Sequence, residues 1–425
     1  MFLLVFYRLF GISIDCENLI NLASGFNMTQ AQLNIYQTGD CCGHSGNYTG
    51  GVACDESSRV HKIKWDSFDL GGQFNTTAWN SLPLLTFSAV SNHISGPIPS
   101  LQNTLNYFYV SKNKLHGTLP LFLHGMAEVG IDNNNLTGTI NLPDSLSYIY
   151  IMFNLLEGSF NSFPPGAKDL YMNDNLFNGS LPLFPSALEG LGLQNNNFNG
   201  LVPSFPFSLG VINLSHNYFT GSIPILPGRL LQLYLGSNHL AGNVPFLPAT
   251  LFEISMEFNQ LNGTFPSVPP NINKLYINNN LFSGSINVES PYILHLENNE
   301  FNLINISDIS NLIECDISNN LLNLNSYSYL SSKCRIYGTN HINLPVDTQS
   351  QEYASTSSSA RYPISFSSIV PFETITNIAI PSQQPAPPAG VTTNIWVVIG
   401  IAIGALVGVN IVIQTIKVRL AKPIA

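Results

Sequence analysis

The feature that most constrains this chain is an asparagine that recurs at nearly constant spacing. Nine of its eleven intervals are 21 residues long, one is 20 and one is 19. Apolar residues stand five and three positions before each asparagine, and Leu, Ile or Phe stands two positions after it, as in the segment 170–182. The series is Asn92, Asn113, Asn134, Asn154, Asn175, Asn196, Asn217, Asn238, Asn259, Asn280, Asn299 and Asn320.

A period near 20 with an L-x-L-x-x-N-x-L frame is typical of a leucine-rich repeat solenoid. Each repeat supplies one short strand, for example around Leu233 and Leu235, whose apolar side chains face inward. One strand cannot bury such a face alone, so neighbouring repeats stack and share one core. The sequence therefore predicts about 12–13 repeats of 21 residues, a curved parallel sheet on the concave side and extended or turn structure on the convex side.

The recurring asparagine is predicted to be structural rather than a binding residue. Its side-chain amide both donates and accepts hydrogen bonds, so it can satisfy backbone groups that the bend after each strand leaves unpaired. The column from Asn92 to Asn320 is therefore expected to point inward.

A glycine follows four positions after the asparagine in ten consecutive repeats. Such a position suits a positive φ or a close approach between stacked turns. Proline follows in most repeats and disfavours a helix there. The glycines are Gly96, Gly117, Gly138, Gly158, Gly179, Gly200, Gly221, Gly242, Gly263 and Gly284.

The frame L-x-L-x-x-N-x-L-x-G-x-I-P, complete in Ile212–Pro224, resembles the plant-type leucine-rich repeat. That family includes receptor-like proteins, receptor-like kinase ectodomains and polygalacturonase inhibitors. Residues 15–62 resemble its cysteine-containing N-terminal cap, and 63–344 would be the solenoid with its C-terminal cap. The resemblance implies the disulfides Cys16–Cys41 and Cys42–Cys54. The chain departs from the family in its shorter period, which is typically 24, and in lacking the tryptophan usual within the cap.

Cysteines and glycosylation sequons favour an oxidising, secreted environment. Cys315 takes a core strand position and Cys334 lies 19 residues later, so adjacent strands are expected to join them in a disulfide, two buried free thiols being the alternative. The N-x-S/T sequons are Asn27, Asn47, Asn75, Asn135, Asn178, Asn213, Asn262 and Asn305.

The two ends of the chain predict a single-pass membrane protein. Residues 1–14 form an apolar run that serves as an atypical signal peptide, since Arg8 interrupts it, and a mis-assigned start codon is an alternative. Residues 345–393 are rich in Ser, Thr and Pro and predict a disordered stalk. Residues 394–413 predict a transmembrane helix, and the basic tail 414–425 places that end in the cytoplasm. A glycosylphosphatidylinositol anchor is the competing interpretation.

Three glycines in the predicted membrane span, Gly400, Gly404 and Gly408, form two overlapping G-x-x-x-G motifs on one helical face. Small residues at this spacing let two helices approach closely. They predict a membrane co-receptor or a homodimer, although glycine is also common in such helices.

Composition narrows the classes of function. Charged residues make up 9% of the chain and the net charge is −10, so nothing favours nucleic acid as a partner. No nucleophile motif, phosphate loop or metal-spaced cluster stands out. We therefore expect no enzyme, no cofactor and no metal site.

The candidate ligand-binding residues stand four positions before the asparagine and point out from the concave face. Tyrosine is favoured at recognition sites, but it also fills strands well as a ladder. Acidic residues near the C-terminal end offer a site for a basic peptide. The candidates are Tyr109, Tyr150, Tyr171, Tyr234, Tyr276, His295 and Asp316.

These patterns favour a plasma-membrane receptor-like protein that binds an extracellular peptide, glycan or protein and signals through a membrane partner. An adhesion or cell-wall-attachment protein is the first alternative. An inhibitor of secreted wall-degrading enzymes is the second, by resemblance alone.

Overall fold

The computed structural model describes residues 14–34, 36, 41–42, 51–323, 327, 330 and 332–338. All of them belong to one compact unit, Met1–Leu344, and a second unit comprises Pro345–Ala425. Residues 1–13 of the predicted signal peptide lie outside the described residues, whereas its last residue, Ile14, begins the first described helix. The predicted stalk, transmembrane helix and tail also lie outside them, as do Asn47, Gly400, Gly404 and Gly408. Within the described part of the chain, no helix is long and apolar enough to cross a membrane.

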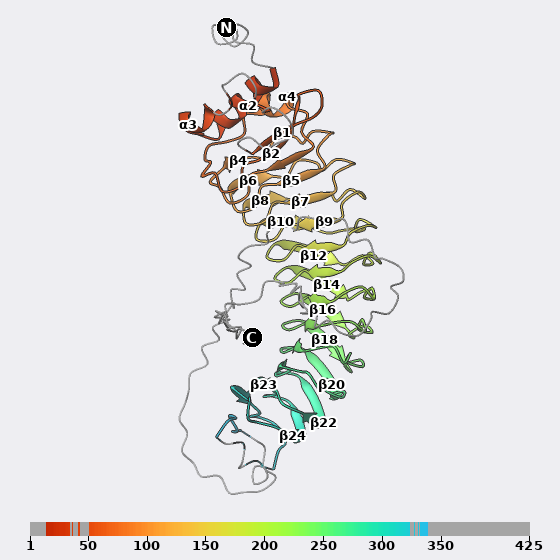
Figure 1. The fold of residues 1–425 in the computed structure, drawn as a ribbon. Coiled ribbons are helices and arrows are strands. Elements are labelled where there is room, and N and C mark those ends of the chain that lie inside the picture. Colours follow the sequence, from red (N-terminus) through yellow and green to blue (C-terminus); the bar gives the residue numbers. More distant parts are fainter. Residues whose placement is uncertain are drawn as a thin grey trace, which may run out of the picture. The chain divides into compact units, whose positions relative to one another are not determined.

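A 14-stranded sheet, here called the main sheet, runs through the stacked repeats (Figure 1). β1 and β2 are antiparallel, and every later pair of neighbours is parallel. Its strands, in order, are β1 (Val52–Cys54), β2 (Val60–Lys64), β3 (Thr86–Ser88), β5 (Tyr107–Tyr109), β7 (Glu128–Gly130), β9 (Tyr148–Tyr150), β11 (Asp169–Tyr171), β13 (Gly190–Gly192), β15 (Val211–Asn213), β17 (Gln232–Tyr234), β19 (Glu253–Ser255), β21 (Lys274–Tyr276), β23 (Ile293–His295) and β25 (Glu314–Asp316).

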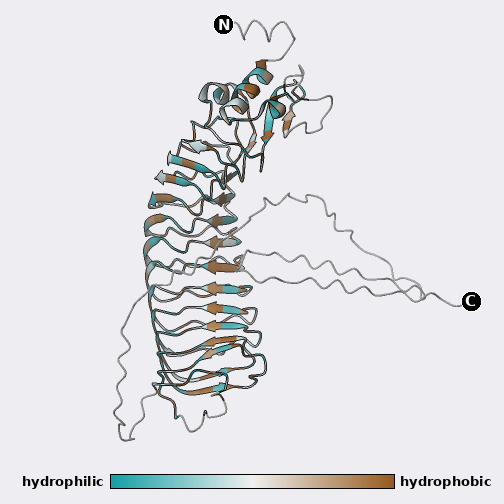
Figure 2. Ribbon diagram, turned by 90° about the vertical axis from the view of Figure 1, so that its left-hand side faces the viewer, coloured by the Kyte–Doolittle hydropathy of each residue, from teal (hydrophilic) through white to brown (hydrophobic). Residues whose placement is uncertain are grey.

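The apolar frame drives this stacking as predicted. In β17, Leu233 is fully buried between two half-buried neighbours, and Leu235 follows it into the core. The phenylalanines two positions after the asparagine stack in the same core, with ring centroids 6.2 Å apart for Phe177 and Phe198 and 6.3 Å for Phe198 and Phe219. Figure 2 shows hydrophobic segments recurring from strand to strand of the stack, with hydrophilic segments beside them. The leucine-rich repeat solenoid of about 13 turns is therefore confirmed.

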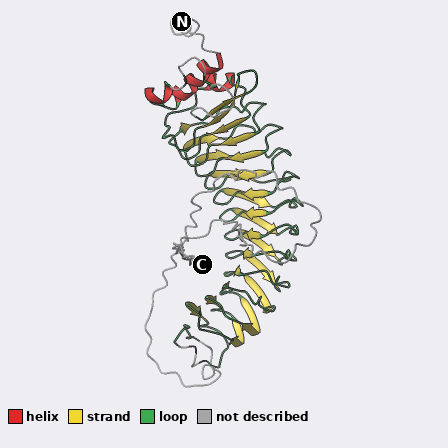
Figure 3. Ribbon diagram, in the orientation of Figure 1, coloured by secondary structure: helices red, strands yellow, loops and turns green. Residues whose placement is uncertain are grey.

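A second, 11-stranded parallel sheet forms on the return path, which the sequence predicted only as extended or turn structure (Figure 3). Its strands begin within three residues of the asparagine and most end at or just after the recurring glycine. They are β4 (Ser95–Gly96), β6 (Lys114–Thr118), β8 (Asn135–Gly138), β10 (Leu155–Gly158), β12 (Leu176–Ser180), β14 (Asn197–Leu201), β16 (Tyr218–Gly221), β18 (His239–Gly242), β20 (Gln260–Thr264), β22 (Leu281–Val288) and β24 (Glu300–Ile306).

The asparagine column is structural, as predicted. Asn196 accepts the backbone N–H of Phe177 at 3.0 Å, and its Nδ2 donates to the carbonyls of Met172, Leu193 and Gln194 at 3.1, 3.1 and 3.3 Å. The same arrangement recurs at Asn217 and its successors. Each amide therefore ties its own turn to the preceding one.

Two positions adopt a positive φ in each of the ten turns that carry the recurring glycine. The recurring glycines do so from Gly96 to Gly284, which confirms the conformational prediction for them. The residue directly before the framework asparagine also does so, and this was not predicted. Asparagine tolerates that region, but Phe153 and Phe258 occupy it at φ 51° and 54°.

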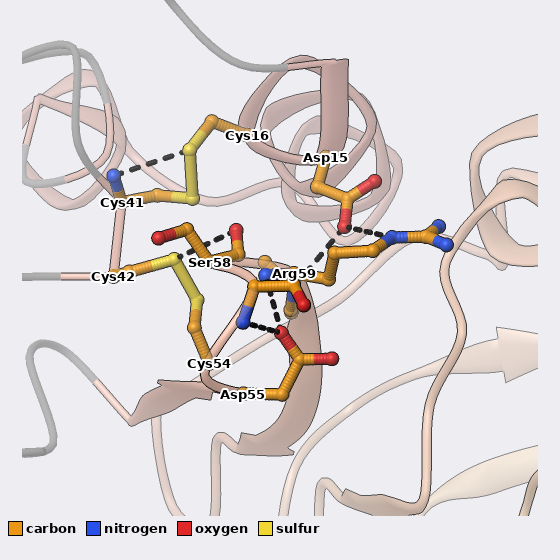
Figure 4. Close-up of a disulfide and its surroundings, with 10 residues drawn as sticks. Asp15, Cys16, Cys41, Cys42, Cys54, Asp55, Ser58 and Arg59 are labelled. Atoms are coloured by element: carbon orange, nitrogen blue, oxygen red, sulfur yellow. Dashed lines mark hydrogen bonds and ion pairs between the residues drawn. A yellow bond between two sulfur atoms is a disulfide. The ribbon is translucent and has the colours of Figure 1, made fainter.

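Among the described residues, three helices lie at the N-terminal end: α2 (Ile14–Gly25) and α3 (Gln30–Leu33) in the cap, and α4 (Thr76–Ser81) after β2. Ile63 pairs with Phe87, 24 residues later, and this longer spacing makes room for α4. The disulfides Cys16–Cys41 and Cys42–Cys54 are both present, as the family resemblance implied (Figure 4). Beside them, Asp15 accepts from the side chain of Arg59 and the backbone of Val60.

The C-terminal end is closed differently. The disulfide Cys315–Cys334 is present, with the two Cα atoms 4.4 Å apart. β22 and β24 are longer than the other strands of the second sheet, and their register shifts where the glycine series stops. The hydroxyl of Tyr327 accepts the N–H of Ile304, so a side chain satisfies the backbone at this edge.

Candidate ligand-binding face of the main sheet

The seven predicted ligand-binding residues lie in one column on the main sheet. The register pairs Tyr150 with Tyr171, Tyr276 with His295, and His295 with Asp316. Between the tyrosines the same column holds Gly130, Gly192, Asn213 and Ser255. We call the solvent-facing side chains of the main sheet the main-sheet face; it corresponds to the predicted concave face.

Two glycines in this column accommodate tyrosine rings from the preceding strand. A Cβ added to Gly130 would lie 2.8 Å from Cδ1 of Tyr109, and one added to Gly192 would lie 2.8 Å from Cδ1 of Tyr171. Each ring therefore leans one repeat towards the C-terminus and fills the space above a strand that has no side chain there.

Carboxylates on the following strand hold some of the tyrosine hydroxyls. Tyr150 donates to Asp169 Oδ2 at 2.8 Å, and Tyr109 donates to Glu128. Gln232 donates both to the hydroxyl of Tyr234 and to Glu253. These contacts explain part of the column as a structural ladder.

Tyr171 differs because the next strand offers Gly190 at the position that Asp169 fills for Tyr150. Its ring stacks on Tyr150 with centroids 5.8 Å apart and an interplanar angle of 10°. Burial raises the pKa of Tyr171 to about 12, so the hydroxyl is neutral at physiological pH. Tyr276 likewise precedes an uncharged residue, Ile293, in the next repeat.

Towards the C-terminal end the main-sheet face is acidic. Lys274 Nζ lies 3.2 Å from Glu253 Oε1. The two ring nitrogens of His295 lie near carboxylates, with Nδ1 3.6 Å from Glu297 Oε1 and Nε2 3.3 Å from Glu314 Oε1. Hydrogen bonding to Glu297 raises the pKa of His295 despite its burial, whereas burial raises the pKa of Glu257. The carboxylates of this region therefore favour the binding of cationic groups.

Asp316 contributes little of its carboxylate to this surface. It is 7% exposed, and its Oδ1 accepts from the backbone and the hydroxyl of Ser318. The other six predicted residues are half-buried, with part of each side chain at the surface.

The sequence analysis missed Asn173 and Gln194, which stand two positions before the framework asparagines Asn175 and Asn196. Asn173 is 0% exposed and Gln194 is 1% exposed. The only sequence signal was polarity at a position that varies among repeats.

The sequons fall on several surfaces. Asn135, Asn178, Asn262 and Asn305 are exposed on the second sheet, and Asn27 is exposed in the cap. Asn75 caps α4 by accepting the N–H of Ala78 at 3.1 Å. Asn213 lies on the main-sheet face and accepts from the hydroxyl of Ser215 at 2.7 Å. Glycosylation of these residues stays a prediction.

Among the described residues, no group of three or more His, Cys, Asp or Glu side chains is arranged to hold a metal ion.

Several solved structures match this chain. The PEPR1–AtPEP1 structure matches with a TM-score of 0.56 and 20% identity over 76% of this chain and 54% of that one. The ectodomain of the plant membrane receptor kinase GASSHO1/SCHENGEN3 from Arabidopsis thaliana, in complex with CASPARIAN STRIP INTEGRITY FACTOR 2, matches with a TM-score of 0.49 and 25% identity over 59% and 38%. A plant ice-binding protein matches with a TM-score of 0.45 and 22% identity over 64% and 87%.

These likenesses are structural. No family model matches the chain, and the comparison with curated proteins gave no significant match. The chain spans only 38% and 54% of the first two solved structures, which are therefore much longer than the region they share with it. The PEPR1–AtPEP1 likeness supports the leucine-rich repeat fold.

Proposed function

We propose that this protein is a cell-surface recognition protein that binds an extracellular peptide or protein through the main-sheet face. The observation that carries the proposal is the in-register column from Tyr109 to His295, which brings aromatic side chains from strands β5 to β23 onto one surface beside the carboxylates of Glu297 and Glu314. Half-buried aromatic side chains with polar tips are enriched at interfaces. PEPR1, whose fold is similar, was solved together with AtPEP1, which is consistent with this use of the fold.

The proposal includes a membrane anchor and a signalling partner. The segment 394–413 is apolar and is followed by Lys417, Arg419 and Lys422. The G-x-x-x-G glycines Gly400, Gly404 and Gly408 supply a face for helix pairing. Pairing of this helix with a membrane partner would pass a signal across the membrane.

A binding screen tests the proposal. The full-length chain, produced in a eukaryotic secretory host, would be screened against a random peptide display library and a glycan array. We expect saturable peptide binding that falls at least about tenfold in the double variant Tyr171→Ala/Tyr276→Ala, the loss of two interface aromatics. These two tyrosines are chosen because Gly190 and Ile293 stand on the following strand at the position that Asp169 fills for Tyr150.

Tyr218→Ala is the matched control. Tyr218 is 53% exposed but lies on β16 of the second sheet, so its removal should leave binding unchanged. Equal loss in the control and the test variant would show that the effect is not specific to the main-sheet face. Absence of any peptide ligand would refute peptide recognition by the main-sheet face.

Adhesion remains a second candidate, favoured by one observation. The hydroxyls of Tyr109 and Tyr150 are bonded to carboxylates of the next strand, as expected of a purely structural ladder. Beads coated with the full-length chain would then cluster with one another while binding no peptide.

A further inference from the structure

The strongest unexplained feature of the main-sheet face is the side chain of Gln194. Both its Oε1 and its Nε2 are buried without a hydrogen-bond partner, and among the described residues it is the only side chain with two such atoms. One strand earlier, Oδ1 of Asn173 is also buried and unpartnered, while its Nδ2 donates to Asp174 at 2.7 Å. Three polar atoms in two adjacent repeats thus lack partners.

Such atoms are costly to bury. A buried donor or acceptor without a partner loses its hydration and gains nothing in return. Orphaned buried groups are rare in native structures, and each calls for a specific explanation. The framework asparagines nearby show that this fold readily satisfies amides, since Asn175 and Asn196 each make four hydrogen bonds.

The surroundings of Gln194 form a site beneath an aromatic ring. A Cβ added to Gly192 would lie 3.4 Å from Oε1 of Gln194 and 2.8 Å from Cδ1 of Tyr171, so the amide and the ring share the space above β13. Gly190, on the same strand, has no side chain beneath the Tyr171 hydroxyl, and a Cβ added there would lie 2.6 Å from that oxygen. Tyr171 lacks the carboxylate partner that holds Tyr150, so its ring can turn without breaking such a bond.

We infer that Gln194, with Asn173 and Tyr171, forms a subsite for the main chain of an extended peptide. A residue in extended conformation turns its own N–H and C=O to the same side. The Gln194 amide matches that pair, because Oε1 accepts the N–H and Nε2 donates to the C=O. Asn173 Oδ1 supplies a further acceptor, and the turned Tyr171 ring packs against the bound chain. This inference rests on the proposed peptide-binding function.

Main-chain recognition has a specific consequence. A contact of this kind holds a peptide through its main chain and does not depend on its side chains. Any preference for particular peptide residues would therefore come from the flanking acidic and aromatic side chains of the main-sheet face. A peptide residue in extended conformation presents its N–H and its C=O side by side at a fixed spacing, so one residue satisfies both atoms of Gln194 together. We therefore assign the subsite to a peptide rather than to a glycan.

Two matched variants test the subsite. Gln194→Met keeps the length of the side chain and removes only the unpartnered amide. Gln102→Met is the control, because Gln102 is hydrogen-bonded, donating to the carbonyl of Trp79 and accepting the N–H of Leu84. We expect an unchanged or higher Tm for Gln194→Met and a lower Tm for Gln102→Met.

We expect peptide binding to distinguish the two variants in the opposite way from Tm, with the loss in Gln194→Met. Peptides selected on the full-length chain from the random display library should bind Gln194→Met at least about tenfold more weakly, the loss of two hydrogen bonds. They should bind Gln102→Met unchanged. Methylating the peptide backbone one nitrogen at a time should identify one residue whose methylation weakens binding to the original chain but not to Gln194→Met.

Each other outcome overturns a distinct claim. Equal binding to the original chain and to Gln194→Met would refute the subsite and leave the proposed function standing. A Tm loss in Gln194→Met as large as in Gln102→Met would show that the amide has a structural partner. Glycan ligands without peptide ligands would refute the peptide assignment, and no ligand of either kind would refute both the proposed function and the inference.

Discussion

The two faces of the main sheet differ in how strongly stacking constrains their side chains, although alternating residues of the same strands form both faces. On the inner side, Leu170, Leu191 and Ile212 are fully buried and repeat with little variation. On the outer side of the same strands, the column passes from Tyr171 to Gly192 to Asn213. Inner positions are fixed by the stack itself, since any change leaves a cavity or an unsatisfied backbone group.

Outer positions are constrained only by their neighbours on adjacent strands. Where the next strand carries an acid, as Asp169 does for Tyr150, the tyrosine is held. Where it carries glycine, as Gly190 does for Tyr171, the ring rests on bare backbone. The contrast teaches that freedom on the outer side is local, and that a ligand has most room where the ladder is interrupted.

The largest effect is expected on the inner side. Asn196→Ala removes an amide that accepts one N–H and donates to three carbonyls, so several buried groups lose their partner. We expect a loss of about 3 kcal/mol or more in the free energy of unfolding, measured by urea denaturation. Asn197→Ala, at the exposed neighbouring position, should change it by less than about 0.5 kcal/mol. Similar losses in both variants would contradict a structural role specific to the column.

Glycine conformation gives the next largest effect. Gly200 has φ 76°, and a Cβ there would lie 3.3 Å from Cβ of Ser180, so Gly200→Ala should cost about 1–2 kcal/mol. Gly228 is the control, because a Cβ there would meet nothing within 4 Å. Gly228→Ala should be neutral or slightly stabilising in the same denaturation experiment. A neutral result at Gly200 would mean that the turn can rearrange.

The inner side could be predicted from the sequence, because its rules repeat. The leucines, the asparagine bonds, the positive φ of the glycines and the Cys315–Cys334 disulfide all follow from stacking identical turns. The second sheet was missed because its pairing depends on the register between successive return paths. The Gln194 site was missed because it depends on Tyr171 leaning over Gly192, a contact between repeats that no single repeat encodes.

A smaller effect sharpens the comparison within the outer side. Tyr150→Phe removes the donor to Asp169, a carboxylate already largely buried, and should cost about 1 kcal/mol. Tyr171→Phe should cost close to nothing, since Gly190 stands at the equivalent place. Thermal unfolding of the two variants side by side measures the difference. Equal losses would indicate that the Tyr171 hydroxyl has a structural role of its own.

The smallest effect is a dependence of stability on pH that arises on the outer side. Burial raises the pKa of Asp169 above 3.8 and of Glu257 above 4.5, and hydrogen bonding to Glu297 raises the pKa of His295 above 6.5. In each case the folded chain binds protons more tightly than the unfolded chain, so stability is fully present below the unfolded pKa and is lost as pH rises through the folded pKa.

The three groups therefore act in one direction, and Tm should be higher near pH 5 than near pH 7.5. Asp308 has the opposite effect on stability, because hydrogen bonds from Ser310 lower its pKa below 3.8. Its contribution to stability is lost as the pH falls through that lowered pKa, which lies below the pH range compared here. Asp169→Asn removes one titrating group and should flatten the lower part of the profile. Gly200→Ala, on β14 of the second sheet, should shift the whole profile without changing its slope. A Tm that rises from pH 5 to pH 7.5 would show that the acidic outer side is not proton-stabilised.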